Sequence, residues 1–106
     1  MIDVVVAYPN SDSLTFDDVY YADKHTPLVN HLLSQHGLLY LRVHRCANEQ
    51  SPYYLMTHLG FDSLEAYEAA FAQVGNQLIE DIGNFTNIEP HIHVYNVIDQ
   101  RDNSIH

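Results

Sequence analysis

The chain has 106 residues, of which 46% are hydrophobic, and it carries 4 Lys+Arg against 14 Asp+Glu for a formal charge of −10 at pH 7. This size and apolar content predict a single domain with one core and argue against long disordered segments. The negative charge argues against nucleic acid or an anionic membrane surface as a partner. Because there is one cysteine, no signal-peptide pattern and no membrane-length apolar run, we expect a cytoplasmic protein without an internal disulfide.

The first half of the sequence predicts a strand, a helix and two more strands. Residues 2–8 are rich in β-branched side chains and end in turn formers, which is typical of a strand. A helix follows with Thr15 as its N-cap and ends at Gly37, and Pro27 predicts a kink or break near residues 25–27. Strands are expected at 38–47 and 53–61, joined by a hairpin loop at 48–52.

The second half predicts a helix and a last strand. Ser63 caps the helix, Gly75 and Asn76 weaken it, and a second short helical stretch is expected before Gly83. The last strand is expected at 89–98, followed by a frayed polar tail at 99–106. This β-α-β-β-α-β order predicts an α+β domain of ferredoxin-like type over residues 1–98, with both helices on one face of an antiparallel sheet.

Side-chain alternation predicts which residues lie on the other face of that sheet. In the last three strands one phase is apolar, and Tyr53 falls in this phase. The opposite phase is rich in histidine and tyrosine and contains Tyr40, Arg42, His44, Cys46, Tyr54, Met56, His58, Gly60, His91, His93 and Tyr95. This face is expected to bind one small, mostly aromatic molecule or, alternatively, to form a hydrated dimer interface.

Two motifs resemble the EthD family. Residues 20–28 read YYADKHTPL and residues 81–90 read DIGNFTNIEP, and family members share a YY-x3-H-x-PL helix and a late D-x2-NFT segment. The resemblance spans nearly the whole chain, although Ala22 stands where the family often has arginine. It implies a ferredoxin-like subunit that pairs sheet to sheet into a homodimeric α+β barrel, so that the polar face would line a lumen. It implies no metal, and it links the family to ether degradation with a monooxygenase system.

The candidate catalytic residues are His25 and Tyr21 on the first helix, and His58 and His93 on the polar face. His25 belongs to the matching motif and lies at an irregular point, where an imidazole can transfer a proton. Its alternative role is to bind carbonyls freed by Pro27. The candidate substrate-binding residues are Tyr40, His44, Met56 and Tyr95.

Several neighbouring residues have more than one interpretation. Tyr20 continues the apolar stripe and is predicted to pack in the core, whereas Asp81 either pairs with a histidine of the first helix or is solvated. The His91-x-His93 spacing would suit zinc if His44 or His58 supplied a third ligand. Some related barrels bind haem through a histidine, but we expect no metal or other cofactor.

The main hypothesis is therefore a homodimeric barrel that binds a small hydrophobic or aromatic metabolite and performs cofactor-free proton transfer, of isomerase, cyclase or lyase type. In this hypothesis His25 is the base or acid and a histidine or tyrosine of the lumen stabilises charge. An oxidoreductase-associated role in degradation, with a monooxygenase as partner, stays open. The alternative of a different class is a non-enzymatic binding or carrier module.

Overall fold

A computed structural model describes residues 1–103 and contains one antiparallel sheet of four strands. The strands are β1 (Ile2–Pro9), β2 (Tyr40–Arg45), β3 (Tyr53–Phe61) and β4 (His91–Asn96), in the spatial order β2-β3-β1-β4. This order confirms the predicted ferredoxin-like α+β fold. The bounds of β3 are as predicted, whereas β2 and β4 are shorter than expected.

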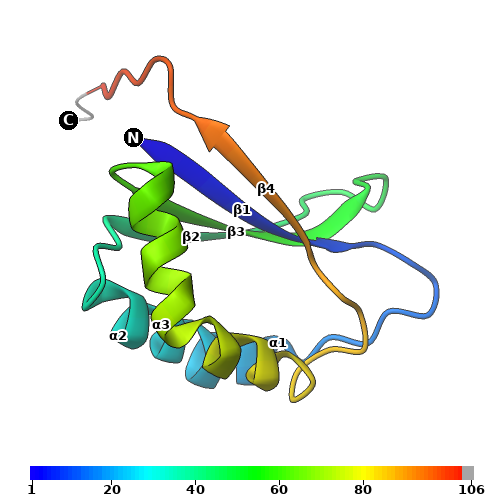
Figure 1. The fold of residues 1–106 in the computed structure, drawn as a ribbon. Coiled ribbons are helices and arrows are strands. Elements are labelled where there is room, and N and C mark those ends of the chain that lie inside the picture. Colours follow the sequence, from blue (N-terminus) through cyan, green and yellow to red (C-terminus); the bar gives the residue numbers. More distant parts are fainter. Residues whose placement is uncertain (104–106) are drawn as a thin grey trace.

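The helices lie together on one side of the sheet (Figure 1). They are α1 (Asp18–Tyr20), the π-helical turn η1 (Tyr21–His25), α2 (Thr26–Ser34) and α3 (Leu64–Ile82). The main core lies between the two layers, where Val4, Leu33, Leu59 and Phe61 are at most 2% exposed. No helix in residues 1–103 has the length and apolar character to cross a membrane.

The first helix starts and bends differently from the prediction. Its N-cap is Asp17, whose carboxylate accepts a hydrogen bond from the Tyr20 backbone, because Thr15 instead binds Asn87 through its own backbone N–H. Of the kink or break expected near residues 25–27, the break is absent. Instead the chain widens into the π-turn η1, in which the Thr26 N–H bonds to the Tyr21 carbonyl, and it continues directly into α2.

The second helix is one element, so the prediction of two stretches is wrong. α3 runs from Leu64 to Ile82 through Gly75, and Ser63 caps it as expected by accepting from the Ala66 N–H. Gly75 is buried, and a Cβ there would crowd the Phe71 ring of the same helix. A glycine inside a helix costs about 1 kcal/mol relative to alanine, which the packing of this face outweighs.

The strand register defines a helix-facing side and an open side of the sheet. Val4 pairs with Leu59 and Val94 on the helix-facing side, and Val5 pairs with His58 and His93 on the open side. Most of the predicted polar phase therefore lies on the open side.

The two tyrosines at the start of β3 are placed the other way round from the prediction. A register shift at Tyr8/Pro9 skips Tyr54 and reverses the alternation at this point. Tyr53 consequently contacts His91 on the open side, whereas Tyr54 packs against Phe16 on the helix side. Assigning Tyr53 to the apolar phase was wrong, because a bulge of one residue leaves no signal in the pattern.

The C-terminal segment after β4 forms neither helix nor strand over residues 97–103. The rest of the predicted frayed tail, residues 104–106, lies outside the described residues. The domain boundary at residue 98 stays a prediction.

Candidate functional site

A cavity of about 450 Å³ lies on the helix-facing side of the sheet. Most of its lining is apolar and comes from both layers and from the segment before β4, including Val6, Val29, Leu41, Leu59, Phe71, Leu78, Ile79, Ile82, Ile88 and Ile92. A few polar side chains interrupt this wall, namely Tyr21, His25, Thr26, Thr57, Thr86, Asn87 and Glu89. An apolar pocket with a few convergent polar groups is typical of a small-molecule site.

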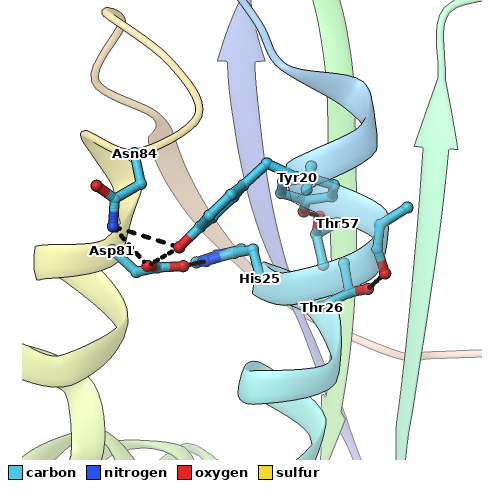
Figure 2. Close-up of polar contacts among 8 residues, drawn as sticks. Tyr20, His25, Thr26, Thr57, Asp81 and Asn84 are labelled. Carbon is cyan, nitrogen blue, oxygen red and sulfur yellow. Dashed lines mark hydrogen bonds and ion pairs between the residues drawn. The ribbon is translucent and has the colours of Figure 1, made fainter.

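His25 is bound to Asp81 in the wall of this cavity. Its Nδ1 lies 2.8 Å from Asp81 Oδ2, and the two side chains are 6% and 13% exposed. The other carboxylate oxygen accepts from the Tyr20 hydroxyl at 2.6 Å and from Asn84 Nδ2 at 2.9 Å, as Figure 2 shows. Asp81 is thereby fixed by three donors, and it orients the imidazole.

The π-turn explains how two residues five positions apart reach the same carboxylate. In an α-helix, Tyr20 and His25 would point about 140° apart. The i→i+5 bonding of η1 widens the helix and brings both side chains toward Asp81 on α3 (Figure 2). The predicted packing of Tyr20 against the core is confirmed, and its hydroxyl in addition binds Asp81. Of the two alternatives for Asp81, pairing with a histidine of the first helix is confirmed.

The charges of this pair follow from its surroundings. Burial lowers the pKa of His25 below its ordinary value, and the hydrogen bond and charge of Asp81 oppose that effect only in part. Burial acts to raise the pKa of Asp81, but hydrogen bonds from Tyr20, His25 and Asn84 outweigh it and lower the pKa. At neutral pH the pair is thus a carboxylate and a neutral imidazole.

The proton of this neutral imidazole lies on the nitrogen that faces the carboxylate. Nδ1–H donates to Asp81, which leaves Nε2 as the basic nitrogen. Within residues 1–103, Nε2 of His25 makes no hydrogen bond to protein. A ligand in the cavity can therefore meet an oriented base.

Two hydroxyl groups line the same cavity beside His25. The hydroxyls of Tyr21 and Thr57 are hydrogen-bonded to each other, and the rings of Tyr21 and His25 are 5.2 Å apart. Burial raises the pKa of Tyr21 to about 12, so its hydroxyl stays protonated. Two hydroxyls carry two protons and use one in their mutual bond, which leaves the other for a ligand oxygen.

The two sequence motifs meet in space around His25. The first motif supplies Tyr20, Tyr21 and His25, and the second supplies Asp81 and Phe85. The Phe85 ring is 3% exposed and lies 4.5 Å from the imidazole and 5.0 Å from the Tyr21 ring, measured between centroids. The late motif thus provides both the carboxylate and an aromatic wall.

A second Asp–His pair lies on the open side of the sheet. His58 Nδ1 is 2.7 Å from Asp3 Oδ2, and the Tyr40 hydroxyl donates to Asp3 Oδ1 at 2.5 Å. Gly60 makes this possible, because a Cβ at that position would overlap the Tyr40 ring. Nε2 of His58 is buried and has no hydrogen-bond partner in residues 1–103. The centroids of the His44 and His58 rings are 4.6 Å apart.

The remaining predicted side chains of the open side border a shallow hollow of about 570 Å³ over β1. Met56, His58, His93 and Tyr95 line it.

The described residues contain no group of three ligating side chains close enough to hold a metal ion, so the His91-x-His93 pair lacks the third ligand that the zinc alternative needs.

The predicted site residues therefore divide between two faces of one sheet. His25 and Tyr21 line the cavity on the helix side, whereas Tyr40, His44, Met56, His58, His93 and Tyr95 lie on the open side. The expectation that His25 and a side chain of the open face act on one ligand is wrong, because the sheet separates them. Sequence reasoning missed Thr57, whose only signal is a polar residue in an otherwise apolar phase of β3.

These features define a ferredoxin-like domain with an Asp–His pair in an apolar cavity beneath its sheet. The EthD domain model matches residues 13–89, so the chain belongs to the EthD family. An EthD-like protein from Ralstonia eutropha JMP134 is 31% identical, with a TM-score of 0.83 over 94% of each chain.

More distant structures share the fold alone. A protein from Shewanella loihica PV-4, provisionally assigned as a monooxygenase, is 16% identical with a TM-score of 0.65 over 93% of this chain and 95% of that one. A dimeric ferredoxin-like protein from an uncultured marine organism is 14% identical with a TM-score of 0.57 over 96% and 98%. No curated protein matches the sequence.

Proposed function

We propose that this EthD-family protein binds a small hydrophobic or aromatic metabolite in the cavity beneath its sheet and transfers a proton on it without a cofactor. The observation that carries the proposal is the Asp81–His25 pair, which lies in an apolar cavity with one imidazole nitrogen left for a ligand. General acid–base catalysis by an oriented histidine contributes typically 10²–10⁴-fold in rate.

The proton transfer uses two neighbouring groups of the cavity. Nε2 of His25 takes a proton from a carbon next to a carbonyl, and the electron pair of the broken C–H bond moves onto the carbonyl oxygen. When the proton comes from a hydroxyl group, the electron pair stays on that oxygen. The free proton of the Tyr21–Thr57 pair then makes a hydrogen bond to that oxygen. Return of the proton from His25 to another carbon completes an isomerisation. In a lyase step the electron pair instead expels a leaving group, which takes the proton from His25. In a cyclisation the ionised carbon attacks a second carbonyl of the ligand, whose oxygen takes that proton.

The test begins with a thermal-shift screen of uncharged aromatic compounds, because a bound ligand raises the unfolding temperature. Ligands found in this way are then assayed for turnover by NMR in deuterated water with His25→Gln. We expect turnover to fall about 10²-fold or more while the Kd changes by less than about threefold. His31→Gln is the matched control, because His31 is an exposed histidine on α2 of the same helical segment.

The carrier alternative gives a different outcome in this experiment. A carrier binds the ligand without turnover or deuterium incorporation. In a carrier, His25→Gln either changes the Kd or has no effect. In that case the protein would sequester or transfer a reactive intermediate, for example for a monooxygenase, and the proton-transfer proposal would be wrong.

We also propose that two copies pair through the open face of the sheet. The molecule carries 14 acidic residues, yet among the described residues only Asp3 and Asp99 line the hollow on this face, and they are paired with His58 and Arg101. Two acidic molecules would therefore repel each other least through this surface.

Sedimentation velocity tests this pairing. We expect a species of about twice 12.2 kDa for the wild type and the mass of one chain for His93→Glu, which places two like charges in the interface. Gln77→Glu on the exposed side of α3 is the control and should not change the mass. A wild type that sediments as one chain at micromolar concentration would contradict the pairing.

A further inference from the structure

The positively charged side chains of the molecule lie outside the wall of the cavity. Its lining within residues 1–103 contains no lysine or arginine. The four cations lie elsewhere: Lys24 is exposed on η1, Arg42 lies over the Tyr40 ring on the open side, Arg45 pairs with Asp18, and Arg101 pairs with Asp99. A negatively charged ligand would find no cationic partner in the cavity.

Two carboxylates at or near the cavity wall add to the unfavourable environment for an anionic ligand. Asp81 lies directly behind His25, and Glu89 is an exposed carboxylate that also lines the cavity. The imidazole contributes no compensating charge, because burial lowers the pKa of His25. An anionic group beside these residues would be desolvated against an apolar wall and repelled by two carboxylates.

We infer that the cavity admits uncharged aromatic compounds and excludes carboxylates, phosphates and coenzyme A esters. The inference rests on the proposed function in that it assigns a substrate class to the same cavity. The proton that His25 removes then comes from a neutral hydroxyl or from a carbon next to a carbonyl.

A matched pair of probes tests the inference by calorimetry at pH 7.5. The naphthalene ring is shared by 2-naphthol, which is neutral at this pH, and 2-naphthoate, which is an anion. We expect the naphthoate to bind at least about 100-fold more weakly, because its charge would be buried without a partner. The difference should persist in about 0.5 M NaCl, where long-range repulsion by the molecule's net charge is screened.

A variant with a cation in the cavity wall should reverse the preference. Ile79 lines the cavity but is 60% exposed, so Ile79→Arg adds a guanidinium without disturbing the core. We expect it to raise the ratio of naphthoate affinity to naphthol affinity about tenfold or more. Gln77→Arg adds the same charge two residues away, at an exposed position outside the cavity lining, and should change neither.

Three results would overturn the inference: naphthoate binding as tightly as naphthol, naphthol not binding, or Gln77→Arg strengthening naphthoate as much as Ile79→Arg. These are binding measurements on probes that need not react. A protein that keeps the charge preference but shows no turnover with any neutral ligand would contradict the proposed proton transfer alone.

Discussion

Replacement of Asp81 by alanine removes the carboxylate that three donors share. Tyr20 is half-buried and Asn84 is exposed, so both can turn to water, but the His25 side chain is only 6% exposed and loses its partner. Loss of one hydrogen bond to a charged group costs about 1.5–3 kcal/mol. The higher helix propensity of alanine returns up to about 0.7 kcal/mol. We therefore expect a net loss of about 1–2 kcal/mol in the free energy of unfolding.

Thermal unfolding followed by circular dichroism measures this loss. For a domain of about 100 residues, a change of this size lowers Tm by roughly 5–15 °C. NMR titration provides a second measurement, because Asp81 raises the pKa of His25 and its removal should lower that pKa further. Glu80→Ala is the matched control, since Glu80 is an exposed acidic residue in the same turn of α3. Equal effects of the two substitutions on Tm, or an unchanged His25 titration, would refute the assigned role of Asp81.

Three further predictions concern stability. Gly60→Ala should cost about 1–3 kcal/mol in urea unfolding because its Cβ would overlap the Tyr40 ring, and an equal cost in a Tyr40→Ala background would contradict this cause. Burial lowers the pKa of His25, so the unfolded chain binds a proton that the folded chain does not, and Tm should rise with pH up to about 6.5. That slope should decrease in His25→Gln, and an undiminished slope would assign the dependence to other groups. Phe85→Ala should cost about 3–5 kcal/mol, because this buried ring packs against the aromatic cluster, whereas Phe85→Leu should cost clearly less by the same measurement.

The sequence predicts the elements well where local signals agree. β3 has the predicted bounds because aromatic and other apolar residues occupy most of it and Pro52 and Ser63 flank it. Pro27 correctly marks an irregular point, but its local rule predicts a kink or break and not a π-turn. Whether a helix breaks or widens depends on what the displaced side chains contact, and here Asp81 lies 56 residues from His25 in the chain. A π-turn stabilised by such distant contacts has no local signature.

Local patterns in the sequence also predict only part of the candidate site. Alternation along a strand identifies side chains that share a face, and it correctly grouped His44, His58 and His93. It does not show which face of the sheet borders a cavity, because that depends on how closely the helices approach. The alternation therefore predicts a site among the polar residues of the open face and does not identify Thr57, which lies on the apolar face that borders the cavity.

The two Asp–His pairs within residues 1–103 differ in whether Nε2 of the imidazole can meet a ligand. Each imidazole binds a carboxylate through Nδ1, so each is oriented in the same way. Nε2 of His58 is buried among protein atoms and cannot meet a ligand unless its surroundings move, whereas His25 lines a cavity with Nε2 left for a ligand. The proposed proton transfer is therefore assigned to His25. The Asp3–His58 pair with Tyr40 instead fixes side chains at the centre of the open face, where the proposed second copy would pack.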